Sequence, residues 1–182
     1  MHLRKAGSAC RLALRIPGWR RSYALAVNGR PVVRPALENG YVSIDCPDGK
    51  QEIELELTMQ PMRVTCHPAV PENVGKVCLQ RGPLVYCLEE ADNGPELWRL
   101  LLPAGSSLVE AEDARWPGGI PDLQADGYRL ADGRQAGLYS LDEKPEMEPA
   151  RLTFIPYFAW SNRTPGEMLV WLRELATAPD AD

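Results

Sequence analysis

The sequence predicts an all-β protein made of two small antiparallel β-sandwiches, jelly-roll-like and packed in tandem. Its apolar runs are short and alternate with a period of two, and no long 3.6-residue pattern is present. The 17 prolines and 15 glycines place turn signals at intervals of roughly 8–12 residues. We expect a first sandwich over residues 1–62, a second over 63–175 whose last strand could return to the first, and a frayed polar tail at 176–182.

The first 46 residues contain clear strand and turn signals. Residues 12–16 place apolar side chains on one face, which is typical of a half-buried strand. A second alternating set, 23–27, ends at Asn28-Gly29, and Asn-Gly between apolar runs is a strong hairpin signal because both residues tolerate a positive φ. Residues 32–33 would return the chain, and another Asn-Gly leads into a strand at 41–44.

The clearest alternation in the chain lies between residues 52 and 59. It places Glu52, Glu54 and Glu56 on one face of a strand. Three carboxylates could indicate acid–base chemistry or a cation site. However, same-face neighbours are about 7 Å apart, and charges on an open face prevent edge pairing and keep a sheet soluble. We therefore interpret them as a solvated face.

The segment from Gly75 to Glu89 organises the centre of the chain. Two apolar runs flank Arg81-Gly82-Pro83, which predicts two buried strands separated by a sharp turn. Cys78 and Cys87 are equidistant from that turn, and buried free thiols are the simplest interpretation. Further short strands are expected at 62–66, 98–102, 107–111, 123–130, 151–159 and 168–172.

Three segments resemble glycoside hydrolase family 127, the β-L-arabinofuranosidase family. Gly75–Glu89 is similar to the pattern GKV-x-L-x-RGPLVYC-E, and Leu14–Trp19 is similar to LRIPGW. Residues 155–168 resemble IPYYAWANR-x-PGEM. All three patterns belong to the C-terminal β-sandwich region of the family, which follows a catalytic α/α barrel that is missing from this sequence.

The resemblance implies hydrolysis of terminal β-L-arabinofuranosides by a zinc-bound cysteine nucleophile and a glutamate acid/base, all within the barrel. A zinc site needs three or four ligands, and the only histidines are His2 and His67. The neighbours Cys66 and His67 would point to opposite faces of a strand. We therefore expect no catalytic, cofactor-binding or metal-binding residue in this chain, with zinc bound in the barrel.

The expected function is that of a non-catalytic accessory and structural region, which supports the barrel and oligomerisation. One alternative is a carbohydrate-binding module for an L-arabinose-containing glycan. A self-contained glycosidase with a site around Glu89, Glu90 and Asp92 is a further alternative, which would need convergent carboxylates with perturbed pKa values.

Four residues are candidates for contact with a sugar or a protein interface: Trp116, Trp160, Tyr157 and Arg81. Trp116 lies in a Pro-Gly-Gly loop and is the best candidate for an exposed aromatic, but a loop residue packed onto the sheet fits the sequence equally well. Tyr157 and Trp160 lie within the family-like motif, where packing at a strand end is the competing interpretation. Arg81 could bind loop carbonyls or dock the barrel.

Composition narrows the range of partners and compartments. The net charge is −5 without a basic stripe, which argues against a nucleic-acid partner. No apolar run approaches the ~20 residues of a membrane span, and the basic N-terminus lacks an apolar signal region. Five scattered cysteines favour a reducing cytoplasm. The expected partners are the catalytic α/α barrel of the same parent protein and a second copy in a homodimer, since bare apolar patches favour self-association.

Overall fold

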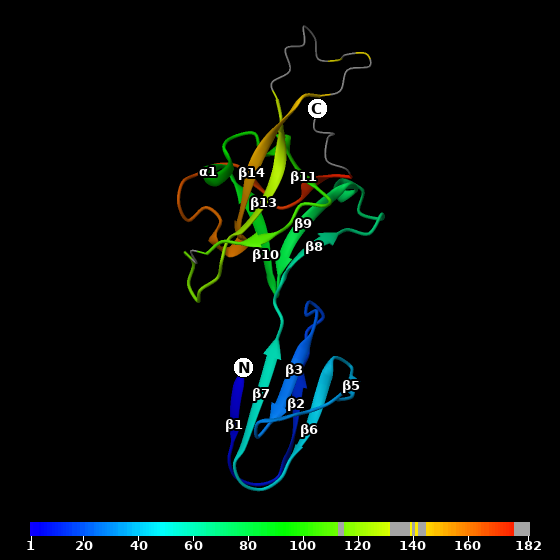
Figure 1. The fold of residues 1–182 in the computed structure, drawn as a ribbon, viewed down its shortest axis with the longest axis vertical. Coiled ribbons are helices and arrows are strands. Elements are labelled where there is room, and N and C mark those ends of the chain that lie inside the picture. The colour runs from blue at the N-terminus through cyan, green and yellow to red at the C-terminus, as the bar shows by residue number, and fades with distance from the viewer. Residues whose placement is uncertain (113–114, 132–138, 140, 142–144, 177–182) are drawn as a thin grey trace. The chain divides into compact units, whose positions relative to one another are not determined.

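The computed structural model describes residues 1–112, 115–131, 139, 141 and 145–176. The chain divides into two compact units, Met1–Gln60 and Pro61–Asp182, and each is described by itself (Figure 1). The described structure is all-β, and its one α-helix, α1 (Glu90–Asn93), has a single turn. In the described residues no helix is long and apolar enough to cross a bilayer. Apart from Ala176, the predicted tail at 176–182 lies outside the described residues.

The first unit consists of two sheets over one core. One sheet has the strand order β1 (His2–Lys5), β7 (Gln51–Leu57), β3 (Tyr23–Val27), β4 (Arg30–Pro31). The other has the order β2 (Cys10–Arg15), β6 (Tyr41–Cys46), β5 (Leu37–Glu38). Both sheets contribute to the buried cluster Leu14, Ile16, Leu25, Val42, Cys46, Ile53 and Leu55.

The alternation of β7 determines which of its side chains reach this core. Ile53 and Leu55 are buried, whereas the three intervening glutamates are exposed. Two of these glutamates pair with residues of β1, at His2 and Arg4. The charged face predicted from the sequence is therefore a solvated face of the sheet.

The Asn28-Gly29 turn connects β3 to β4 as the sequence predicts. Both residues have positive φ, 51° and 74° respectively. The Asn28 side chain also reaches β7, because its Oδ1 accepts from the Glu52 amide at 2.8 Å and its Nδ2 donates to Gln51 at 2.7 Å. One residue thus supplies both the turn conformation and a link to the neighbouring strand.

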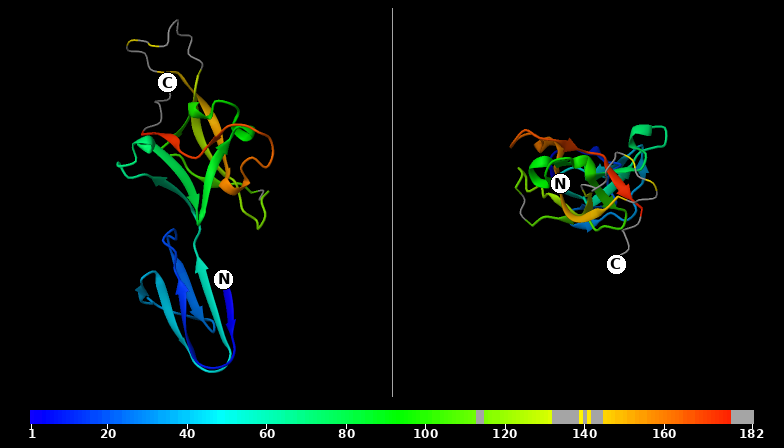
Figure 2. Two further views of the ribbon diagram at one scale, coloured as in Figure 1. Left: turned by 180° about the vertical axis from the view of Figure 1, so that it is seen from behind. Right: turned by 90° about the horizontal axis from the view of Figure 1, so that it is seen from above.

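The second unit is a closed six-stranded barrel. Its strands, in order around the barrel, are β9 (Lys76–Arg81), β10 (Leu84–Glu89), β14 (Met147–Pro156), β13 (Leu123–Leu130), β11 (Leu100–Pro103) and β16 (Leu172–Leu175). β16 pairs in parallel with β11 and antiparallel with β9, which closes the ring. Figure 2 shows the red β16 beside the green part of this sheet. Three short strands add to the barrel: β8 (Pro61–Thr65) on β9, β15 (Met168–Leu169) on β10, and β12 (Val109–Glu110) on β13.

The prediction of two sandwiches in tandem, jelly-roll-like, is therefore wrong. Alternation indicates which side of a strand faces a core, but it does not show whether the first and last strands of a sheet pair with each other. Here Leu172 lies opposite Val77, and this register joins β16 to β9. Closure removes the sheet edges that an open sandwich would leave. The barrel interior is filled by Val77, Leu79, Tyr86, Leu88, Leu97, Leu100, Leu102, Leu123, Ala125, Leu152, Phe154 and Leu172.

Strand β10 is buried on both faces from Tyr86 to Glu89. Tyr86 and Leu88 belong to the barrel interior, and Tyr86 donates its hydroxyl to the Pro121 carbonyl at 2.9 Å. Cys87 points away from that interior into a second apolar cluster with Ile155 and Ala159. Cys78 and Cys87 are both buried free thiols, as the sequence indicated.

Candidate functional site

An ion-pair cluster lies where β10 ends, on the outside of the barrel. Glu89 is the last residue of β10, and Asp92 is in α1. Arg163, which follows the 3-10 turn η3 (Tyr157–Ala159), pairs with both carboxylates. Its Nη1 lies 2.8 Å from Asp92 Oδ1. Arg115 extends the cluster, with contacts of 3.2 Å to Asp92 and 2.7 Å to Asp122.

The carboxylates of the cluster are largely buried, whereas the two arginines reach the surface. Glu89 is 2% exposed, and its second oxygen accepts from the Ser161 amide at 2.7 Å. Burial alone would raise the pKa of Asp92, but hydrogen bonds from Arg163 and Arg115, together with their charges, outweigh burial and lower it. The hydrogen bond to Asp92 raises the pKa of Arg163 despite partial burial. Because unpaired charges are costly to bury, loss of one of these partners would destabilise the local structure.

Trp116 is part of this cluster and not an open platform. Its indole N–H donates to Asp122 Oδ1 at 2.5 Å. The guanidinium carbons of Arg115 and Arg163 lie 5.2 and 6.0 Å from its ring centroid. The half-buried ring packs against the cluster formed by Cys87 and its neighbours. The sequence left open whether this residue is exposed or packed, because Asp122 and the two arginines are brought together only by the fold.

Tyr157 and Trp160 form an exposed aromatic pair. Their side chains stack with ring centroids 6.1 Å apart and an interplanar angle of 27°. Tyr157 is 45% exposed and Trp160 is 41% exposed, and Phe158 between them is also exposed. The contacts of Ser161 and Arg163 with Glu89 fix the backbone directly after this pair. The fold therefore exposes two stacked aromatic side chains on a segment whose following residues are anchored to Glu89.

Arg81 has a different environment from the one the sequence suggested. Its guanidinium forms a two-point ion pair with Glu110, at 2.7 and 3.1 Å. This contact connects β9 to β12. The arrangement is that of a structural tie between two strands.

The three carboxylates of the alternative enzymatic site do not converge on one point. Glu89 and Asp92 meet at Arg163, whereas Glu90 accepts from the Glu167 amide at 2.9 Å. Glu167 in turn accepts from the Leu97 amide at 2.8 Å. These carboxylates therefore act as hydrogen-bond acceptors that fasten the 157–169 segment to α1 and to the turn that follows it.

Cys66 and His67 lie in a local turn. The Cys66 thiol donates to the Val70 carbonyl at 3.7 Å, and His67 Nδ1 accepts from the Ala69 amide at 3.1 Å. Across the part of the chain that the structure describes, no group of three or more His, Cys, Asp or Glu side chains is arranged to hold a metal ion.

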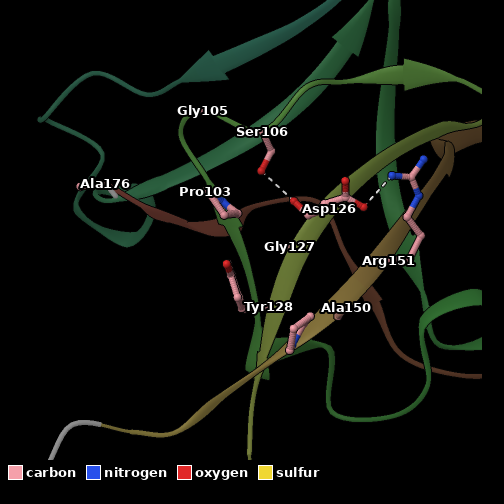
Figure 3. Close-up of a pocket in the computed structure, with 10 residues that line it drawn as sticks. Pro103, Gly105, Ser106, Asp126, Gly127, Tyr128, Ala150, Arg151 and Ala176 are labelled. Carbon is pink, nitrogen blue, oxygen red and sulfur yellow. Dashed lines mark hydrogen bonds and ion pairs between the residues drawn. The ribbon is translucent and has the colours of Figure 1, made fainter. Parts of the chain in front are cut away.

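A cavity of about 690 Å³ opens between β11, β13 and β14 (Figure 3). Its polar lining groups are mostly paired with one another. Ser106 donates to the Asp126 carbonyl at 2.7 Å, and Arg151 pairs with the Asp126 carboxylate at 2.7 Å. Arg151 also donates to Gln124 at 3.1 Å. Sequence reasoning missed this cavity, because its lining residues carry no motif and come from three strands, the loop after β11 and the residue after β16.

Comparison with known proteins identifies relatives of both units. Residues 2–59 match the domain described as "Beta-L-arabinofuranosidase, GH127 middle domain". Residues 61–173 match "Glycoside hydrolase family 127 C-terminal domain". A non-reducing end β-L-arabinofuranosidase from Bifidobacterium longum subsp. longum is 42% identical over 173 residues, which cover 91% of this chain and 26% of that protein.

Solved structures show the same relationship. A GH127 β-L-arabinofuranosidase from Geobacillus stearothermophilus T6 superposes with a TM-score of 0.84 at 35% identity, over 96% of this chain and 28% of that one. A second glycoside hydrolase gives a TM-score of 0.76 at 32% identity, over 95% of this chain and 30% of its own. The chain thus spans less than a third of the length of these relatives. The matches to the middle and C-terminal domains show that this chain belongs to glycoside hydrolase family 127.

Proposed function

We propose that this chain is a non-catalytic accessory region of a β-L-arabinofuranosidase-like glycoside hydrolase, which supports a catalytic α/α barrel and its oligomerisation. The observation that carries the proposal is the identity of the matched domains. They are the middle and C-terminal domains of the family, and they correspond to 26% of the curated relative.

The environment of the carboxylates supports a structural role. A general acid or base must exchange a proton with a substrate within hydrogen-bonding reach. Glu89 is almost fully buried, and its two oxygens are engaged by the Ser161 amide and by Arg163. Both oxygens of Asp92 are likewise held by arginine. Against the effect of burial, the contacts with Arg163 and Arg115 lower the pKa of Asp92, and the contacts of Glu89 fasten the segment that follows the aromatic pair.

In this proposal, zinc and the reacting groups belong to the barrel, as the family resemblance implies. The chain supplies a rigid surface on which the barrel or a second copy docks. A cytoplasmic location remains part of the proposal.

The test combines two preparations. The purified chain, with zinc and reductant, is assayed on a chromogenic β-L-arabinofuranoside, and no turnover above the buffer control is expected. The catalytic portion of the Bifidobacterium relative is then added as a separate polypeptide. We expect co-elution of the two polypeptides and a gain in the activity or thermal stability of the catalytic portion. Turnover by this chain alone would overturn the non-catalytic assignment, and absence of any association would overturn the supporting role.

The stacked pair Tyr157–Trp160 favours a second candidate function, binding of an L-arabinose-containing glycan. Sugar rings stack on exposed aromatic faces, and this pair is held in place by the ion-pair cluster behind it. Affinity electrophoresis in an arabinan gel tests it. Trp160→Ala should abolish retardation, whereas Trp98→Ala removes a more exposed tryptophan elsewhere on the unit, 53% against 41% exposed, and should leave retardation unchanged. Equal mobility of all three proteins with and without arabinan would exclude this function.

A further inference from the structure

Two cysteines face each other across the smaller sheet of the first unit. Cys10 on β2 is the direct antiparallel partner of Cys46 on β6. The Ile16 amide donates to the Gly40 carbonyl two residues beyond the Leu14–Val42 pair, and hydrogen-bonded pairs alternate along an antiparallel ladder. Cys10 and Cys46 therefore occupy a hydrogen-bonded pair site. Such sites have Cα atoms about 5.5 Å apart, within the range that disulfides span.

The two thiols differ in accessibility, which gives each a distinct part in an exchange reaction. Cys10 is exposed, whereas Cys46 is 2% exposed and belongs to the core. Burial raises the pKa of the Cys46 thiol, and interaction with the Cys10 thiol raises it further, while the Lys5 ammonium opposes both effects. An incoming reagent can therefore reach Cys10 first, and Cys46 is placed directly beside it.

The strand ends next to this pair are held together by other contacts. The Ala9 amide donates to Asp48 Oδ1 at 2.6 Å. The Lys5 ammonium donates to the Pro47 carbonyl at 2.8 Å and to the Gly7 carbonyl at 2.9 Å. These contacts keep the register of Cys10 and Cys46 before any covalent bond forms.

We propose that Cys10 and Cys46 form a reversible cross-strand disulfide by exchange with a low-molecular-weight disulfide such as oxidised glutathione. The Cys10 thiolate attacks one sulfur of glutathione disulfide, which forms a mixed disulfide and releases one glutathione thiolate. The Cys46 thiolate then attacks the Cys10 sulfur, which forms the Cys10–Cys46 bond and releases the second glutathione thiolate. The two protons lost by the protein thiols go to the two glutathione thiolates, so two protein thiols are oxidised and one glutathione disulfide is reduced.

The remaining cysteines are less suited to this reaction. Cys66 is partly exposed, and its thiol donates to a carbonyl in its own turn. Cys78 and Cys87 are buried, and burial raises the pKa of both thiols. Cys10 is the exposed cysteine of the five, which makes it the point of entry.

The experiment treats the full chain with oxidised glutathione and then follows intact mass and disulfide-linked peptides. We expect loss of two hydrogen atoms, a peptide that links Cys10 to Cys46, and full reversal by dithiothreitol. Cys66→Ser is the matched control and should behave as the unmodified chain does. Cys10→Ser, a surface change, should abolish the bond. Cys46→Ala should stop the reaction at the glutathione adduct on Cys10.

Two results would overturn the proposal. One is a glutathione adduct that persists on Cys10 in the unmodified chain, because Cys46 would then be unable to displace it. The other is a bond mapped to any other cysteine pair, or a Cys10→Ser variant that still loses two thiols.

Discussion

The guanidinium of Arg163 pairs with the buried carboxylate of Glu89, 74 residues away in the sequence. This contact joins the segment after η3 to the end of strand β10. The same guanidinium also holds Asp92 in α1. The exposed aromatic pair Tyr157–Trp160 thus lies beside a charged cluster that fixes its position.

Removal of Arg163 should strongly destabilise the second unit. Arg163→Met leaves Glu89 buried without its cationic partner, which costs about 3 kcal/mol or more. The matched control is Arg151→Met, because Arg151 pairs with the largely exposed Asp126 and an exposed pair contributes up to about 1 kcal/mol. The free energy of unfolding in urea measures both changes. Equal losses for the two variants would show that the Arg163 cluster is not a structural joint.

The stability of the second unit should fall at acidic pH because of Asp92. The folded-state pKa of Asp92 is lowered below its unfolded value by the two arginines, which outweigh burial. Its contribution is therefore fully present above the unfolded pKa of about 3.9. The contribution is lost as pH falls through the folded pKa, where the carboxylate takes up a proton.

Urea midpoints measured between pH 7 and pH 3 test this dependence. The unmodified chain should lose stability toward pH 3 more steeply than Asp92→Asn, because the amide cannot take up the proton. Parallel curves for the two proteins would mean that Asp92 makes no net contribution to acid sensitivity.

Patterns of neighbouring residues correctly predicted the burial of one strand and the position of one hairpin turn. Alternation around Ile53 and Leu55 correctly placed these residues inside and the intervening glutamates outside. Asn28-Gly29 correctly predicted a hairpin turn, because the positive φ values require residues of this type. The motif resemblance correctly predicted the family of the chain.

Long-range pairing accounts for what the sequence did not reveal. The barrel closes where Leu172 pairs with Val77, and nothing in the sequence around either residue identifies the other as its partner. Trp116 is held by Asp122 and two arginines, one of which comes from a distant segment. The Cys10–Cys46 pair depends on the register of β2 with β6, which the spacing of cysteines along the chain does not reveal.

The Cys87 thiol should be inert in the folded protein. Burial raises its pKa to about 12, with the neighbouring Glu89 charge acting in the same direction. At pH 8 the reactive thiolate is therefore a very small fraction. Iodoacetamide labelling followed by peptide mapping should modify Cys10 in the native chain and Cys87 only after unfolding in urea. Rapid native labelling of Cys87 would indicate that the cluster around Ile155 opens readily.

The Cys10–Cys46 bond should stabilise the first unit. It closes a loop of roughly 35 residues, for which the chain-entropy model gives up to about 4 kcal/mol, less any strain in the native geometry. A unit of this size gains ~4–8 °C in Tm for each kcal/mol. Calorimetry of the oxidised chain should therefore show the transition of the first unit at least about 5 °C higher, with that of the second unit unmoved. Dithiothreitol should reverse the shift, and Cys10→Ser should show none. An oxidised chain that melts at or below the reduced temperature would mean that the bond strains the β2–β6 ladder by as much as it restricts the unfolded chain.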